Sequence, residues 1–487
     1  MFKLSDTQRQ RIDKIYAYLY KLTYILFLYG GGVIMALYSR HGYFDMMESK
    51  ASLFNMMMLF LLPLFTVLIV LKIILGKNRK TLFTVFLTVF LLTALISTVL
   101  SFSAANAFDG KQGWYVGSYA MLCLVFAVLS MKDDKTIDPK MYIPLFVVFF
   151  FESIVVIFDV MDIHILPFKK EMNDSHFFFN GTIGNNNWCV GYFSLFVPFL
   201  FYLYLSCKER YKAILFMMLG VTGLLASILN WADSICLSYM FASFVLIPYV
   251  LTDLIRIRRF VLFLAVFFIS VALISSNETF MTYTLYYDSI FIVLFEHKTF
   301  LCLISGLCLL FYVLSLKTKD DTYKKYSRYL ICIVSVFYIV MMILAVGKTL
   351  SLDADIDSRR FELWGLSLEK FASFSLKDKL FGVGPELVRN LYARLYSKYG
   401  TVYTVSHSEI VQSLLTLGIG GASMWMLCWF ELIRMCIQRV KNNEIFIGIL
   451  MSLLGYLGQS FFNSATLLNL CILSILVIAA LQNRDFS

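Results

Sequence analysis

Apolar runs of about 20 residues recur from one end of this chain to the other. A helix of that length spans the hydrocarbon core of a bilayer, whereas the strands of a lipid-facing barrel would alternate over about 10 residues. The composition agrees, because the 487 residues are 60% hydrophobic and only 15% charged, against about a quarter charged in ordinary globular chains. The sequence therefore predicts an all-α polytopic membrane protein.

The positions of Lys and Arg predict the topology of about fourteen transmembrane helices. Short cytoplasmic loops carry an excess of these residues. With the N-terminus inside, the inside segments hold 25 of them and the outside loops before residue 348 hold 6. We therefore expect a single integral membrane domain over 1–487 with both termini cytoplasmic, and no nucleic-acid partner despite the net charge of +10. The expected spans are 15–38, 52–76, 81–103, 114–130, 142–160, 187–206, 213–229, 234–251, 260–275, 299–316, 329–348, 408–433, 445–462 and 467–481.

A large loop, residues 349–407, is expected outside the membrane before the third-last transmembrane helix. Residues 348–407 hold nine Lys and Arg residues, which breaks the charge rule. Long loops are exempt from that rule, so an ordinary translocated loop and an anion-binding loop both stay open. Helical spacing is seen first at Phe361, Trp364, Leu368 and Phe371, and then at Leu387, Leu391 and Leu395.

Arginines of this loop are the candidates for binding an anion. Arg359 and Arg360 open the first helical pattern, where the partial positive charge of a helix N-terminus would add to their own. A guanidinium offers a planar fork that matches phosphate oxygens and stays charged in any environment. Arg389 and Arg394 are further candidates in the second pattern. The alternative for the first pair is contact with lipid headgroups.

The stretch "TVSHSEIVQSLLTLGIGG" starts an apolar helix with a polar turn that contains His407, Glu409 and Gln412. A capping box with Ser406 as the cap and Glu409 at the third helical position would explain part of it. It would not explain His407, whose ordinary pKa of about 6.5 lets it accept a proton near neutral pH. We therefore expect His407 to take part in chemistry at the membrane boundary.

Two other polar stretches have open interpretations. The acids Asp353, Asp355 and Asp357 resemble a metal-binding pattern, but solvation or neutralisation of nearby arginines is the expected role, and no metal is predicted. The stretch "FFFNGTIGNNNWCVGYF" contains Asn185 and Asn187. It is either a simple turn before a helix or a polar floor for a sugar.

Three stretches, in this order, resemble the O-antigen ligase and O-antigen polymerase superfamily of bacterial membrane glycosyltransferases. "GTIGNNNWCVGYFSLFVPFL" is similar to the family's Gly-Thr-x-x-Asn-x-Asn segment at a helix start. "SRRFELWGLSLEKF…LFGVGPE" is similar to its Arg-x-x-x-Trp segment and Phe-Gly-x-Gly-Pro turn, with Arg360 and Trp364 in the matching places. "HSEIVQSLLTLGIGG" is similar to its His-Asn-x-x-Leu-Gln…Gly-x-x-Gly helix, with His407 as the matching histidine. The resemblance covers about residues 180–440.

The resemblance implies a GT-C-like membrane enzyme of a bacterial inner membrane that builds surface polysaccharide, of O-antigen or capsule type. The donor would be a glycan on polyprenyl (undecaprenyl) pyrophosphate, and the acceptor a sugar hydroxyl at the outer face. Arg360 would stabilise the leaving pyrophosphate, His407 would act as base, and Glu409 or Gln412 would orient it. No cofactor is implied, inversion is expected, and a chain-length regulator is a possible partner.

The chain departs from the family pattern in ways that leave alternatives open. The turn over 230–238 lacks the family's arginine, so another residue would replace it, and Ser408 follows His407 where the family has Asn. Polymerase is favoured over ligase because no site for a lipid A core is evident. A lipid-linked oligosaccharide flippase is the other alternative, and it should show two similar halves and charges within its helices. No such repeat is seen, and Lys21 and Lys72 are the charges assigned to spans.

Overall fold

Helices are the regular secondary structure of the part of the chain that its computed structural model describes. The described residues are 5–42, 45–78, 80–132, 138–161, 163, 165–166, 180–277, 289, 291–318, 323, 329, 336, 360–392 and 402–482. They contain no strand, and a single β-bridge joins Asn180 and Thr182. Within these ranges nine helices are long and apolar enough to cross a membrane. The predicted class, a multi-pass α-helical membrane protein, is confirmed.

The predicted count of fourteen spans is met only in part. Beside the nine long helices, four shorter apolar helices coincide with four more of the predicted segments: Ser118–Met131, Ser234–Val250, Ile445–Ser460 and Leu467–Leu481. The remaining segment, 329–348, lies almost wholly outside the described residues. Fourteen spans and the outer position of the 349–407 loop therefore stay predictions.

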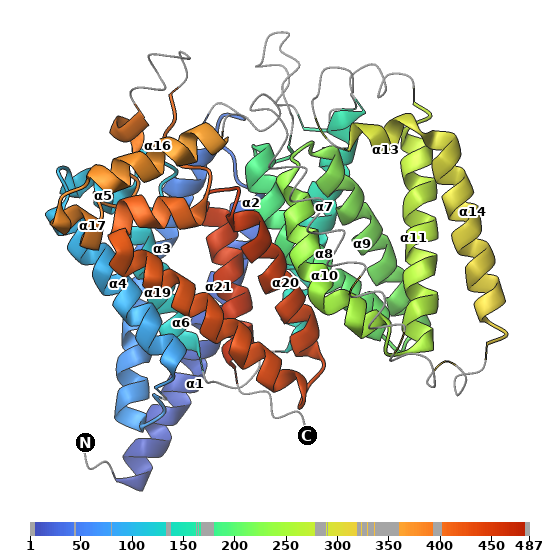
Figure 1. The fold of residues 1–487 in the computed structure, drawn as a ribbon. Helices are drawn as coiled ribbons and strands as arrows, with labels where there is room; N and C mark the ends of the chain where they lie inside the picture. The colour runs from blue at the N-terminus through green and yellow to red at the C-terminus, as the bar shows by residue number, and fades with distance from the viewer. Residues whose placement is uncertain are drawn as a thin grey trace. The chain divides into compact units, whose positions relative to one another are not determined.

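Contacts divide the chain into two compact units. The helices of each unit can be found in Figure 1 by their labels. The first unit takes residues 1–148, 360–439 and 460–487. Its helices are α1 (Asp6–Tyr29), η1 (Gly30–Ile34), α2 (Met35–Leu37), α3 (Met46–Leu75), α4 (Leu82–Leu100), α5 (Ala104–Asp109), α6 (Ser118–Met131), η2 (Pro139–Tyr142), α16 (Arg360–Ser373), α17 (Leu376–Phe381), η4 (Arg389–Tyr392), α19 (Glu409–Val440) and α21 (Leu467–Leu481).

The second unit takes residues 149–359 and 440–459. Its helices are α7 (Ile143–Val160, which begins in the first unit), α8 (Asn186–Ser206), α9 (Arg210–Leu229), α10 (Ser234–Val250), α11 (Leu254–Ile274), α13 (Ile292–Glu296), α14 (Lys298–Ser315) and α20 (Ile445–Ser460). Figure 1 shows two antiparallel pairs of helices, α8 beside α9 and α11 beside α14. A short turn joins α8 to α9.

Three consecutive glycines let helices of the first unit approach closely. Residues Gly30–Ile34 form a π-helical turn after α1. A Cβ on Gly32 would lie 2.4 Å from the Leu145 side chain, and one on Gly31 would lie 3.2 Å from Cys471. Lipid tails are as apolar as leucine, so membrane helices gain their attraction from such close backbone packing rather than from excluding water.

Helix α19 is broken at Gly418, where φ is 66° and ψ is −170°. Figure 1 shows its two segments running in different directions. The carbonyls of Leu415 and Thr416, which lose their helical partners, accept hydrogen bonds from the N–H groups of Val383 (3.0 Å) and Gly384 (3.1 Å). Irregular backbone at membrane depth persists only where protein satisfies its polar groups. The 382–386 loop supplies those groups here.

Two glycines make this docking possible. A Cβ on Gly382 would come within 2.2 Å of the Thr416 carbonyl group, and one on Gly418 within 2.4 Å of the Leu380 carbonyl carbon. Both residues also have positive φ, the region that favours glycine. The "FGVGPE" loop and the break in α19 are therefore built for each other.

Residues 360–392 fold onto the first segment of α19. Their first helix, α16, confirms the predicted helical pattern, but its buried face is a different one. Leu363 and Leu366 lie in a core with Val388, Tyr392 and Leu415. By contrast, Leu368 from the predicted apolar stripe is 54% exposed. The second pattern is a short 3-10 helix, Arg389–Tyr392, and its continuation over 393–400 lies outside the described residues.

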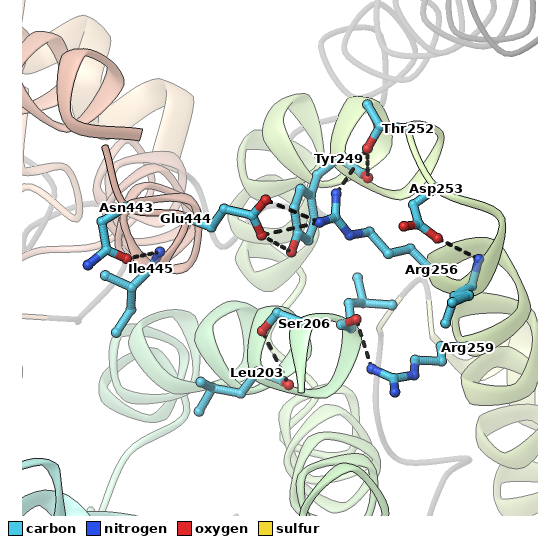
Figure 2. Close-up of polar contacts among 12 residues, drawn as sticks. Leu203, Ser206, Tyr249, Thr252, Asp253, Arg256, Arg259, Asn443, Glu444 and Ile445 are labelled. Carbon is cyan, nitrogen blue, oxygen red and sulfur yellow. Dashed lines mark hydrogen bonds and ion pairs between the residues drawn. The ribbon is translucent and has the colours of Figure 1, made fainter. Parts of the chain in front are cut away.

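The second unit is tied together at the start of α11 by an arginine cluster. Figure 2 shows Glu444 facing Arg256 and Tyr249. The Arg256 guanidinium lies 3.8 Å from the centre of the Tyr249 ring, 3.2 Å from a Glu444 oxygen and 3.0 Å from the Thr252 hydroxyl. The next two arginines of α11 donate to carbonyls at the C-terminal ends of α8 and α14. Such contacts at helix C-termini are favourable for cations.

Candidate functional site

The polar turn before α19 is built differently from the predicted capping box. The helix begins at Glu409, and Ser408 is its cap: the Val411 N–H donates to the Ser408 hydroxyl (3.4 Å). The prediction that Ser406 caps, with Glu409 at the third helical position, is therefore wrong. Ser406 is instead fully buried and donates its hydroxyl hydrogen to the Ser408 carbonyl (2.9 Å).

Two predicted site residues hold the backbone of Ser406, directly before His407. The Trp364 indole N–H donates to the Ser406 carbonyl (2.9 Å), and the Ser406 N–H donates to the Gln412 amide oxygen (2.9 Å). The turn is thus fixed from α16 on one side and from α19 on the other. Phe361 and Phe462 pack edge-on against the Trp364 ring and fix its position.

His407 occupies the tip of this turn in a left-handed backbone conformation, with φ of 51°. Its ring packs edge-on against Trp114 with 5.7 Å between ring centres. The Nδ1 atom is buried and has no hydrogen-bond partner among the described residues. Burial, and then the charge of Arg360, lower the His407 pKa to about 4. The ring is therefore neutral near pH 7, and it carries a buried polar atom that a ligand would satisfy.

Arg360 lies close enough to act on His407, because its charge contributes to that pKa shift. It is the first residue of α16, as the sequence predicts, and is partly buried. The structure therefore brings Arg360, Trp364 and His407 together, along with Gln412. Arg359 lies outside the described residues.

Glu386, like Trp114, is a residue of this cluster that the sequence patterns did not single out as a candidate. It is 6% exposed. Its carboxylate accepts a hydrogen bond from the Trp114 backbone N–H and one from the Gln412 side-chain amide (3.4 Å). Burial raises the Glu386 pKa to about 7, against the lowering effect of these two hydrogen bonds. An acid that directly follows Gly-x-Gly-Pro between apolar segments was the available signal.

Backbone strain gathers at the same place. Four non-glycine residues in the described ranges have positive φ, and three of them, Tyr115 (63°), Glu386 (60°) and His407 (51°), lie in or next to this cluster. Such conformations are uncommon for residues with a side chain and cost about 1–3 kcal/mol each, and they gather at functional sites. The strain is a second, independent sign that this turn is built for more than packing.

A cavity of about 200 Å³ lies beside the cluster. Its wall is mostly apolar and comes from α4, α6, α19 and α21, while Glu386, Glu409 and Gln412 supply polar atoms. Glu409, also predicted as a site residue, is 6% exposed. Ligand sites in proteins combine an apolar wall with a few placed polar groups. This cavity has that composition and has two carboxyl groups in its lining.

Of the other predicted loop residues, the structure describes Arg389, which is exposed on η4. Arg394 lies outside the described residues, as do Asp353, Asp355 and Asp357. No group of three or more His, Cys, Asp or Glu side chains suited to a metal occurs in the described part of the chain. Arg389 and Arg394 therefore stay predictions as anion-binding residues.

The "NGTIGNNN" stretch belongs to the second unit, where its groups are used in local structure. Asn185 caps α8 by accepting a hydrogen bond from the Asn187 N–H (2.9 Å). The backbone N–H and hydroxyl of Thr182 both donate to Glu152, which is fully buried in α7. A Cβ on Gly181 would lie 2.4 Å from a Glu152 oxygen. These contacts favour the simple turn over the sugar floor.

The prediction that Lys21 and Lys72 are the charges within spans is wrong, because buried acids also lie within them. Glu152 is buried in α7, and Glu431 is buried in α19, where it binds Arg434. Charged groups inside membrane helices are rare and mark either function or a specific partner. Here the partners are visible: Thr182 for Glu152 and Arg434 for Glu431.

No protein-family model matches the chain, and no curated protein matches it either.

Proposed function

We propose that this chain is a membrane glycosyltransferase of the O-antigen polymerase type, in a bacterial inner membrane. It would transfer a glycan from polyprenyl pyrophosphate to a sugar hydroxyl at the outer face, with inversion and without a metal ion. The observation that carries the proposal is the strained turn at His407, held by Trp364 and Gln412 beside Arg360 and a largely apolar cavity.

The chemistry suits these residues. The acceptor oxygen attacks the anomeric carbon, its bond to hydrogen breaks, and the bond from that carbon to the pyrophosphate oxygen breaks with its electron pair. Pyrophosphate is a good leaving group, so the protein needs mainly to stabilise its charge. A guanidinium fixed at a helix N-terminus can do this in a site with low-dielectric walls. Arg360 has that place, and Arg359, Arg389 and Arg394 are proposed to assist it.

His407 is proposed to hold the acceptor hydroxyl. Its ring is neutral near pH 7 and has a nitrogen without a protein partner among the described residues. With the ring hydrogen on Nδ1, that nitrogen can donate a hydrogen bond to the acceptor oxygen and aim it at the anomeric carbon. The apolar part of the cavity is suited to a hydrocarbon portion of the donor lipid.

The first test uses His407→Ala in cells. Transfer should fall by up to about 10², because a misplaced reacting group can cost that much in rate, and lipid-linked repeat units should accumulate because their supply continues. The matched control is Ser408→Ala, which removes only a helix cap and about 1 kcal/mol of stability. Normal long-chain polymer in His407→Ala cells, at normal protein level, would exclude the role.

The second test uses purified protein, donor lipid and two acceptors, a second donor molecule and a lipid-anchored sugar, with EDTA present. Extension of the first acceptor supports the polymerase, and extension of the second supports a ligase. Movement of donor across vesicles without any transfer would replace the proposal with the flippase. Transfer that needs added Mg²⁺ or Mn²⁺ would reject the metal-independent mechanism.

A further inference from the structure

Glu386 is placed by three separate elements of the first unit. It belongs to the loop that docks on the break in α19, and its carboxylate binds the Trp114 N–H from the 109–117 turn and the Gln412 amide from α19. It also lines the cavity with Glu409, whereas His407 is not among the described residues that line it. Of the acid–base groups in the cluster, the carboxyl groups are therefore the ones that border the cavity.

The protein makes room for this carboxylate at a cost. A Cβ on Gly113 would lie 1.7 Å from Glu386 Oε2, so only glycine permits the observed approach. Glu386 itself, and Tyr115 beside Trp114, have positive φ. A carboxyl that only anchored the loop would not require strain on both sides of the contact, since a surface ion pair or an apolar contact would serve.

The pKa values of Glu386 and His407 are shifted in opposite directions. Burial raises the Glu386 pKa to about 7, whereas burial and Arg360 lower the His407 pKa to about 4. A general base works best when its pKa lies near the working pH. A group with a pKa of about 7 can both take a proton and return it to solvent, while a group with a pKa of about 4 holds a proton only weakly.

We propose that Glu386 is the base that takes the proton from the acceptor hydroxyl, and that His407 only holds that hydroxyl. This assignment rests on the proposed function. As the acceptor oxygen bonds to the anomeric carbon, its proton passes to the Glu386 carboxylate, the glycosyl–oxygen bond breaks, and the pyrophosphate leaves with the electron pair. Glu386 then returns the proton to water, so atoms and charge balance.

The groups around Glu386 fix what its titration should report. Trp114 and Gln412 donate hydrogen bonds to it, and neither is charged. Glu409 shares the cavity, and Arg360 acts on the adjacent His407. A negative charge placed near Glu386, on ionised Glu409 or on bound pyrophosphate, would raise the Glu386 pKa further.

The activity test compares the pH dependence of kcat/KM, which reports the free enzyme, for wild type, Glu386→Gln, Glu386→Asp and His407→Gln, with donor lipid in vesicles. Wild type should lose activity as pH falls through about 7. Glu386→Gln should lose about 10² to 10⁴ in kcat with little change in KM for the donor, and its residual rate should lack that loss at low pH. Glu386→Asp should recover part of the rate, and His407→Gln should keep the pH dependence of wild type.

Two results would overturn the assignment: a wild-type kcat in folded Glu386→Gln, or the same acid limb in that variant as in wild type. The titration of Glu386 is also measured without substrate, by infrared spectroscopy. The band of its protonated carboxyl group should be present in wild type and missing in Glu386→Gln. Absence of such a band in wild type below pH 7 contradicts the proposal even if no variant is active. A band at the expected pH with no transfer by wild type would instead reject the proposed function. If Glu386→Gln does not fold, the carboxyl band of Glu386→Asp is compared with that of wild type instead, and a shift of the band in this variant identifies position 386 as its source.

Discussion

Two polar clusters of this protein contain similar side chains and differ in how fully those side chains are satisfied. In the second unit, Arg256 pairs with Glu444, stacks on Tyr249 and binds Thr252, and none of these residues has a positive φ (Figure 2). In the first unit, His407 keeps a buried nitrogen without a described partner, and Glu386 is an acid with its pKa raised to about 7. The cluster around Arg256 holds helices together. The cluster around His407 and Glu386 leaves groups available for a ligand and stores backbone strain, which is how sites for chemistry differ from structural contacts.

The largest expected contrast is between two arginines. Arg360→Ala should reduce transfer by about 10² to 10³, the typical loss when one charge-stabilising donor is removed, with little loss of stability. Arg360→Lys should keep part of the rate, because it keeps the charge and loses the fork. Arg256→Ala should lower the melting temperature and spare transfer. Equal transfer rates in Arg360→Ala and wild type would assign Arg360 to the lipid headgroups and remove it from the site.

The second contrast is the pH dependence of stability. The pKa of Glu386 is higher in the folded chain, about 7, than its ordinary 4.5. The stabilisation from holding the proton is thus complete below about pH 4.5 and is lost as pH rises through about 7, up to about 3 kcal/mol at 1.36 kcal/mol per pKa unit. The melting temperature of wild type relative to Glu386→Gln should therefore fall between about pH 5 and about pH 8. A difference that stays constant would show that Glu386 is not protonated in the folded chain.

A smaller effect is expected from the glycine that makes room for Glu386. Gly113→Ala should displace the carboxylate, because a Cβ there would lie 1.7 Å from Oε2. A shift of about 1 Å at a reacting group can cost up to about 10² in rate, so we expect a loss of about 10 to 10². The matched control is Gly365→Ala on α16, where an added Cβ meets nothing within 4 Å. Similar kcat values for both variants would contradict the positioning of Glu386.

The smallest expected effect lies in the second unit. Glu444→Gln should lower stability by about 1 kcal/mol or less, because Glu444 is 59% exposed and solvent screens the pair. Its transfer rate should match wild type, as measured with the same donor lipid. A loss of transfer at full protein level would mean that the second cluster also serves the reaction, and the contrast between the two clusters would fail.

Sequence patterns anticipated part of the site because its residues lie at recognisable local positions. His407, Gln412 and Glu409 mark a polar start on an apolar helix, and Arg360 opens an amphipathic one. The sequence patterns did not identify Glu386 and Trp114 as candidates, because the two residues form a site only through a contact between segments 272 residues apart in the chain. The roles of Asn185 and Asn187 were left open for the same reason: Asn185 turned out to be an ordinary cap.

The sequence by itself determined the class of this protein, because each apolar run of about 20 residues must bury itself in lipid or protein whatever its neighbours are. It also determined where α16 and α19 lie along the chain. Only the tertiary structure decided that α19 breaks at Gly418, that the 382–386 loop satisfies the freed carbonyls, and that this loop carries Glu386 to Trp114 and Gln412. Hydrophobic periodicity is a local property, whereas the partner of a buried carbonyl or carboxyl is chosen by the whole fold.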